Sequence, residues 1–123
     1  MGTPGSYLRL ARTWQDGDTV RLVLPMEFRL TQYTGLDQNP RQWWQKVDLE
    51  HHNRYALSYG PILMALVGSK DTQLDISPEE LPAALLPDGD KPLHFAIRGR
   101  DDCHYEPYWA LGMEEMTCFP KFK

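Results

Sequence analysis

Residues 6–26 read SYLRLARTWQDGDTVRLVLPM, and this stretch decides which fold class the sequence predicts. Apolar residues occupy every second position on both sides of its centre: Leu8, Leu10, Val20, Leu22 and Leu24. A period of two is the pattern of a β-strand. Between the two runs lies Asp16-Gly17, a strong hairpin dipeptide, because hairpin turns need residues that tolerate positive φ. The stretch therefore predicts two strands joined by a tight turn, with Pro25 ending the ladder.

Asp16 and Asp18 raise a second interpretation, a pair of catalytic carboxylates. A glycosidase needs two carboxyl groups roughly 5 to 9 Å apart. Catalytic carboxyls also need burial or a charged neighbour to shift their pKa, and an exposed loop tip supplies neither dependably. We therefore interpret both aspartates as turn residues.

Strand patterns continue along the chain. Residues 26–34 alternate again, and residues 54–67 are apolar on both alternating faces from Ile62 onward, as expected of a central covered strand. Gly60-Pro61 interrupts that run and predicts a bulge or kink where the strand changes direction. Further strands are expected at residues 93–99 and, as a short last strand, at residues 116–119.

Other segments read differently. Residues 35–53 are polar, lack a period and contain Pro40, so they predict a long surface loop or insertion. Ser77-Pro78-Glu79-Glu80 has the pattern of a capping box and predicts one short helical turn near residues 78–85, which Pro82 keeps short. With 10 prolines and 9 glycines as punctuation, the chain predicts an all-β fold: one antiparallel β-sandwich domain, jelly-roll-like, over residues 1–123.

Composition narrows the function classes. The chain has 123 residues, 41% of them hydrophobic, and a formal net charge of -4, which offers no phosphate-neutralising surface; no nucleic-acid partner is expected. The apolar run at residues 62–68 is far shorter than the roughly 18 to 20 residues that span a bilayer, so no membrane partner is expected either. Residues 1–10 show no secretory signal pattern, and the compartment stays open. Cys103 and Cys118 are equally compatible with one bridge or two buried thiols.

Candidate chemistry is sparse. His51-His52 and Cys103-His104 are adjacent pairs whose side chains diverge, so neither predicts a metal site, and no cofactor is expected. No motif encodes a nucleophile. One alternative is a small enzyme whose site gathers the scattered residues Asp101, His104 and Glu106.

Tryptophans supply a binding hypothesis. Trp43, Trp44 and Trp109 could stack on the flat C–H faces of sugar rings. Packing in the core or against a neighbouring domain is the competing explanation. A carbohydrate-binding module that uses these side chains is therefore kept as an alternative function.

Two ordered motifs carry a family resemblance. The first occupies residues 7–29, with YLRLARTW, the GD of Gly17-Asp18 and LPMEFR at its end. The second is YALSYGPILMA, residues 55–65, and a looser PYW follows at residues 107–109. This order resembles the C-terminal β-sandwich region of the β-L-arabinofuranosidase glycoside hydrolases, glycoside hydrolase family 127.

The resemblance implies a supporting role. In that family the catalytic glutamate and the cysteine-bound zinc lie in a large α/α barrel that precedes this region. Cys103 and Cys118 lie outside both motifs, so no catalytic or metal role is carried onto them. The chain is expected to be a fragment-like, non-catalytic accessory domain that packs against and stabilises such a barrel. If strands from elsewhere normally complete the sandwich, self-association through an unpaired strand edge is expected.

Overall fold

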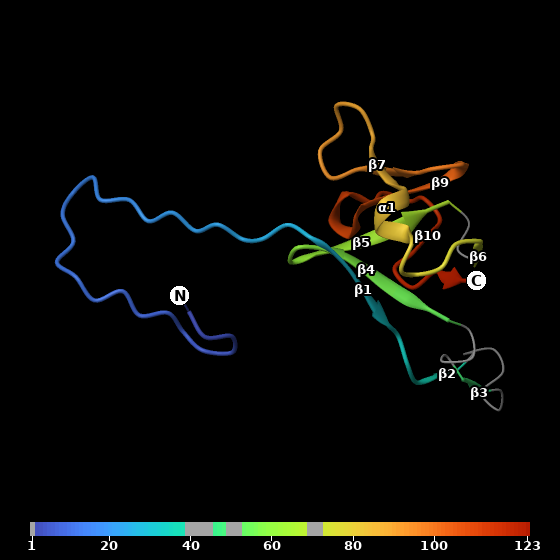
Figure 1. Ribbon diagram of the computed structural model, residues 1–123, viewed down its shortest axis with the longest axis horizontal. Coiled ribbons are helices and arrows are strands. Elements are labelled where there is room, and N and C mark those ends of the chain that lie inside the picture. Colours follow the sequence, from blue (N-terminus) through green and yellow to red (C-terminus); the bar gives the residue numbers. More distant parts are fainter. Residues whose placement is uncertain (1, 39–45, 49–52, 69–72) are drawn as a thin grey trace.

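The chain is an all-β protein, as the sequence predicts. The computed structural model describes residues 2–38, 46–48, 53–68 and 73–123. Its elements are β1 (Phe28–Gln32), β2 (Leu36–Gln38), β3 (Lys46–Asp48), β4 (Tyr55–Tyr59), β5 (Ile62–Val67), β6 (Gln73–Leu74), α1 (Leu81–Ala84), β7 (Leu85–Pro87), β8 (Phe95–Ile97), β9 (Arg100–Pro107), the 3₁₀ turn η2 (Tyr108–Ala110), β10 (Met116–Thr117) and β11 (Lys121–Phe122). Figure 1 shows most of them gathered in one body, from which residues 7–26 extend away.

The body is built on one antiparallel sheet with the strand order β1-β4-β5-β9-β8-β7, to which β10 adds by pairing with β5. β5 lies at the centre, and its last four residues, Met64 to Val67, are buried. This agrees with the prediction of a central covered strand in residues 54–67. Two smaller sheets, β6 with β11 and β2 with β3, complete the described strands.

Gly60-Pro61 reverses the chain completely, where a bulge or kink was predicted. Tyr59 pairs with Ile62, so these two residues are a hairpin loop between β4 and β5. Gly60 has φ +57°, which fits the first central position of a type II′ turn, and proline fits the second because its φ is fixed near −65°. The pattern of residues 54–67 is thus two strands in succession, a half-buried β4 and a largely buried β5.

β9 is the longest strand, and the sequence patterns above do not predict it. Its residues alternate between a buried face, which carries Cys103 and Tyr105, and a face with the polar side chains of His104 and Glu106. Charged residues at Arg100–Asp102 and His104–Glu106 mask this alternation in the sequence. β9 pairs with β5 on one side and β8 on the other.

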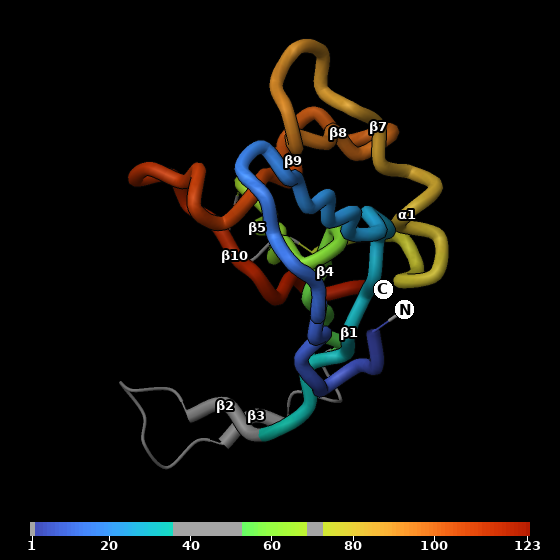
Figure 2. The backbone as a smooth tube through the Cα atoms, turned by 90° about the vertical axis from the view of Figure 1, so that its left-hand side faces the viewer, coloured from blue at the N-terminus to red at the C-terminus, as the bar shows by residue number. Residues whose placement is uncertain are grey.

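The core lies on one face of the sheet, where α1 and the β6–β11 pair cover it. Leu66, Tyr105 and Phe95 stand side by side across β5, β9 and β8, and Leu81 of α1 is fully buried against the same cluster. The sheet curls: Phe28 of β1 lies 5.0 Å from Phe95 of β8, measured between ring centroids, although three strands separate them in the strand order. Figure 2 shows the backbone of the body turned by 90° from the view of Figure 1.

The predicted helical turn is confirmed at residues 81–84. The Glu80 carboxylate accepts hydrogen bonds from the Ser77 hydroxyl, at 3.0 Å, and the Ser77 amide, at 3.4 Å. The capping box predicted at Ser77 is wrong, because the N-cap of α1 is Glu80 and makes no side-chain cap hydrogen bond. The bonds between Ser77 and Glu80 close the turn that precedes the helix. The helix ends after one turn, and β7 follows directly.

Within residues 35–53, predicted as a loop, β2 and β3 form a two-stranded antiparallel ladder that pairs Leu36 with Asp48. Residues 39–45 and 49–52 lie outside the described part of the chain. The last strand, expected at residues 116–119, is present as β10, and β11 follows it.

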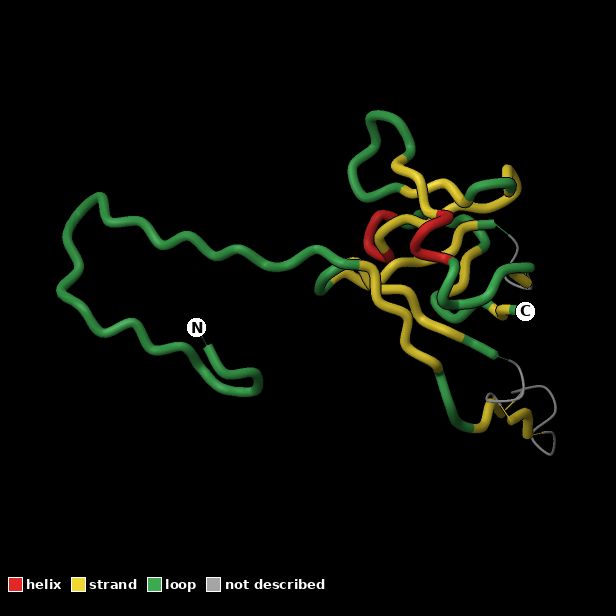
Figure 3. Tube along the Cα trace, viewed as in Figure 1, coloured by secondary structure: helices red, strands yellow, loops and turns green. Residues whose placement is uncertain are grey.

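The predicted hairpin of residues 6–26 is wrong in one respect: the turn forms, but the two strands do not. Figure 3 shows residues 7–26, hereafter the arm, as a loop over their whole length. The reason is energetic, because a two-stranded hairpin without a third strand or a surface to cover is marginal in water. The arm has the sequence pattern of strands and no partner among the described residues.

The base of the arm is held against the β4–β5 turn. The Gly60 amide donates to the Glu27 carbonyl at 2.9 Å. A Cβ placed on Gly60 would lie 2.5 Å from the Met26 sulfur and 3.0 Å from the Pro25 carbonyl oxygen. Glycine is therefore needed here twice, for its positive φ and for the close approach of residues 25–26.

Gly60→Ala should lower the free energy of unfolding by about 1 kcal/mol or more beyond the cost of positive φ alone, since the new methyl group collides with Met26 and Pro25. Gly89→Ala is the matched control, because Gly89 has a similar φ of +53° and open space around it. Urea unfolding followed by circular dichroism measures both. Equal losses for the two variants would contradict the contact at the base of the arm.

Candidate functional site

The arm is the largest exposed apolar feature of the described residues. Its apolar side chains are between 39% and 102% exposed. They are Tyr7, Leu8, Leu10, Trp14, Val20, Leu22, Val23, Leu24 and Met26. Monomeric proteins rarely expose this many large apolar side chains, so the arm is the candidate interaction site.

The turn at the tip of the arm is well formed. Asp18 donates its amide to the Gln15 carbonyl at 3.1 Å, and its carboxylate accepts the Gln15 amide at 2.9 Å. Arg12 forms an ion pair with the same carboxylate, and its guanidinium lies 5.1 Å from the centroid of the Trp14 ring. Gly17 has φ +88°. These contacts support the interpretation of Asp16 and Asp18 as turn residues, since Asp18 is occupied by the turn itself.

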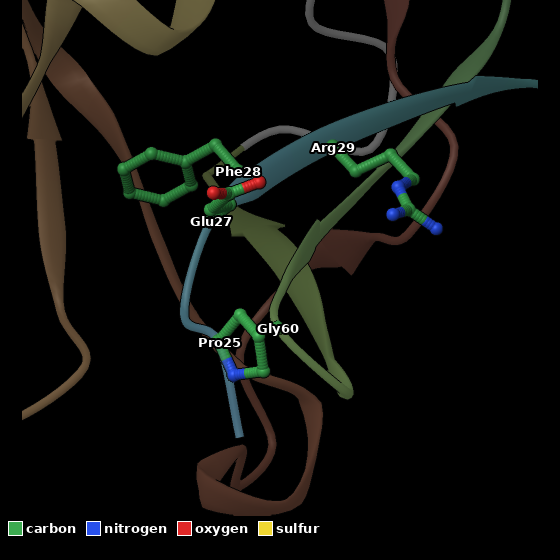
Figure 4. Close-up of a pocket in the computed structure, with 5 residues that line it drawn as sticks. All are labelled: Pro25, Glu27, Phe28, Arg29 and Gly60. Carbon is green, nitrogen blue, oxygen red and sulfur yellow. The ribbon is translucent and has the colours of Figure 1, made fainter. Parts of the chain in front are cut away.

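A cavity of about 250 Å³ lies where the arm joins the body. Figure 4 shows its lining residues, Pro25, Glu27, Phe28, Arg29 and Gly60. Phe28 and Arg29 point to opposite sides of β1, so the aromatic ring enters the core while the guanidinium stays outside. The cavity carries one acidic and one basic side chain and is open to solvent.

One of the three predicted sugar-stacking tryptophans is placed by the structure. Trp109 is 56% exposed on η2, and its neighbour Tyr108 is 53% exposed. The two rings meet edge to face, with an interplanar angle of 81° and 5.8 Å between centroids. Trp43 and Trp44 lie outside the described residues, so sugar stacking by the three tryptophans stays a prediction.

The outer face of β9 carries a compact polar cluster. The carboxylate oxygen Oε2 of Glu106 lies 3.0 Å from Nε2 of His94 and 3.1 Å from Nε2 of His104. The two imidazole rings are stacked, with an interplanar angle of 18°. Glu106 lies opposite Ala65 of β5, and its side chain is only 11% exposed. The carboxylate is thus enclosed between two histidines.

His94 has an acceptor at each ring nitrogen. Its Nδ1 lies 2.9 Å from the Pro92 carbonyl oxygen, and its Nε2 faces Glu106. Through these two contacts the His94 ring ties the loop before β8 to the sheet.

This cluster meets the enzyme hypothesis in part. His104 and Glu106 come together as that hypothesis requires, while Asp101 is exposed and makes no hydrogen bond to either among the described residues. Sequence patterns do not indicate His94 as a member of this cluster. The strand register does, because Ala96 pairs with His104 and residue 94 therefore lies on the same face. No nucleophile contacts the cluster among the hydrogen bonds of the described residues.

The neighbouring pair on β9 is an ordinary surface ion pair. Arg100 donates two hydrogen bonds of 2.7 Å to the Asp102 carboxylate. These bonds hold the pKa of Asp102 down, at about 2, and raise the pKa of Arg100 above its usual value. Both residues remain charged across the neutral range.

Both cysteines are free thiols. Burial raises the pKa of Cys103 and of Cys118, which makes each a weaker nucleophile at neutral pH. Burial also raises the pKa of Tyr105, whose hydroxyl has no hydrogen-bond partner in the described structure.

The described residues contain no group of three or more histidine, cysteine, aspartate or glutamate side chains placed to hold a metal ion. In the same residues, no helix is long and apolar enough to cross a membrane. No family model, curated protein or solved structure matches the chain. The likeness of residues 7–29 and 55–65 to the arabinofuranosidase family therefore stays a prediction from motifs.

Glu106→Ala should lower the free energy of unfolding by about 1–3 kcal/mol, because it removes the acceptor that His94 and His104 share; the His94 side chain is 19% exposed and that of His104 38%. Asp102→Ala, on the same face of β9 but exposed, is the control and should change stability little. Thermal or urea unfolding at pH 7 measures both. A Glu106→Ala variant as stable as the parent would show that the cluster does not hold the loop.

Proposed function

We propose that this chain is a non-catalytic accessory β-domain that packs against a second folded domain, and that the arm is the segment buried in the process. On the motif resemblance, the second domain is the catalytic α/α barrel of a glycoside hydrolase related to the β-L-arabinofuranosidases. The observation that carries the proposal is the row of unpartnered apolar side chains on the arm.

The accessible surface of the chain supports this role. A compact monomer of its mass exposes about 6,800 Å². The chain exposes 9648 Å², an excess of about 2,800 Å² over the compact expectation. Stable interfaces bury about 1,200–2,000 Å² in total, and obligate ones more. The excess is larger than the area that a standard interface buries, and the exposed arm contributes to it.

The sheet supports a docking role as well. β1 joins the arm to a core that contains no arm residue: the buried cluster comes from β4 to β9, α1 and β11, and β1 packs Phe28 and Leu30 against it. A rigid body with a projecting apolar segment is suited to anchoring one domain on another. Catalysis by the chain itself would need a nucleophile or metal site that neither the motifs nor the described side chains supply.

The test is co-expression with an α/α barrel of the arabinofuranosidase family from which its own C-terminal region has been removed. The chain should co-purify with the barrel and raise its melting temperature, whereas Leu22→Glu should abolish both effects. Leu86→Glu, an exposed leucine on β7, is the matched control and should bind normally. The chain alone should not hydrolyse an aryl β-L-arabinofuranoside. Failure to bind, or turnover by the chain alone, would contradict the proposal.

A carbohydrate-binding module is the second candidate, and the exposed Tyr108–Trp109 pair favours it. Aromatic rings on the surface can stack on sugars, although an edge-to-face pair presents a single ring face and not a flat platform.

Calorimetric titration with arabinose-containing oligosaccharides tests that candidate. If Trp109 is a platform, Trp109→Ala should weaken binding at least tenfold, and Trp43→Ala and Trp44→Ala measure the contribution of the other two tryptophans. No heat with any of the sugars would remove the candidate and leave the accessory role.

A further inference from the structure

β1 presents a free strand edge. The Tyr33 amide donates to the Arg54 carbonyl and the Gly60 amide to the Glu27 carbonyl, so odd-numbered residues of this strand face β4. In an antiparallel ladder the residues between them direct both backbone groups away. The N–H and C=O groups of Phe28, Leu30 and Gln32 therefore point to the open side, where the described residues pair none of them.

The sequence and register of β1 itself contain no feature that discourages pairing. Natural edge strands are protected by proline, by several charges or by a bulge. β1 has the sequence FRLTQ, without proline, with one charge, and with a regular register to β4 over its whole length. The edge is a template for another strand.

The arm contains a strand-forming segment that has no pairing partner among the described residues. Residues 19–24, TVRLVL, alternate with period two, contain no proline, and make no backbone pairing beyond the turn at residue 18. Chains with unsatisfied strand segments and free edges add to one another by main-chain hydrogen bonds.

The arm is directed away from the edge of its own copy. Met26 and Pro25 are held against Gly60, so the chain leaves the body as a continuation of β1 (Figure 1). Folding back on β1 would require a reversal within residues 25–27, which these contacts occupy. The edge of a second copy has no such restriction.

Charge favours the second copy. Residues 1–26 contain three arginines and two aspartates, a formal charge of +1. Since the whole chain has a formal charge of -4, residues 27–123 have a charge of -5. This attraction acts between the arm and the acidic body as a whole, since the two strands that would pair carry one arginine each, Arg21 and Arg29.

We infer that two copies of this chain associate by exchanging arms, with residues 19–24 of each copy pairing antiparallel with the free edge of β1 in the other. The contact is two-fold symmetric, because the same two strands meet twice. The inference rests on the proposed function only in taking the arm as the binding segment. The barrel and a second copy would therefore compete for the arm.

Light scattering after size-exclusion chromatography of the full chain, over about 1 to 100 μM, tests the exchange. The molar mass should rise with concentration to about twice 14.3 kDa. Leu22→Glu should raise the dimer dissociation constant about tenfold or more, because it removes a buried leucine from each of two contacts. Leu86→Glu, the same change on β7, should leave dimerisation unchanged.

A proline pair tests the strand edge separately. Gln32→Pro removes an outward N–H and should weaken the dimer while circular dichroism shows an intact fold, since edge strands tolerate proline there. Thr31→Pro removes an N–H that faces β4 and should destabilise the fold itself. A full chain that stays monomeric at about 100 μM, or a Leu22→Glu chain that dimerises as tightly as the parent, would overturn the inference. A chain that dimerises through its arm but never binds a barrel would remove the proposed function alone.

Discussion

The antiparallel pairing of β5 with β9 is the interaction on which the rest of the structure depends. It places Leu66 beside Tyr105 at the centre of the core, and β4, β8 and β10 attach to its outer edges. On the opposite face the same pairing puts Glu106 over Ala65, between the two histidines. Because β9 is made of polar and apolar residues in alternation, one strand supplies both the core and the polar cluster.

The arm follows from a limit on what this core can bury. The curled sheet closes its own apolar face with the contact between Phe28 and Phe95 and with α1. The leucines and valines of residues 8–24 then have no surface left to cover in their own copy. A chain with this surplus is stabilised by a partner, and both the barrel and a second copy offer the apolar cover and the main-chain hydrogen bonds that the arm lacks.

In this chain, sequence patterns predict local structure better than they predict which strands pair with one another. The alternation of β1 and the turn at Asp16-Gly17 depend on neighbouring residues, and both are found. The cap predicted at Ser77 is wrong, because the helix begins only at Leu81. β9 escapes sequence prediction because charges conceal its buried face. Gly60-Pro61 resembles a kink in one strand because the residues on both sides of it are apolar. The strands predicted in the arm do not form for another reason. Alternation shows which face a strand would bury, but it does not show whether another strand is present to pair with it. His94 joins the site through cross-strand register, which sequence spacing does not reveal.

Residues 19–24 have the sequence of a strand but are unpaired in a single copy of the chain. Amide hydrogen exchange read by mass spectrometry on dilute, monomeric protein measures this directly. The amides of residues 19–24 should exchange at the rate of an unstructured peptide, while those around Leu57 and Leu66 should be protected by several orders of magnitude. Protection of residues 19–24 equal to that of β5 in the monomer would contradict the account, because the arm would then be folded on its own body.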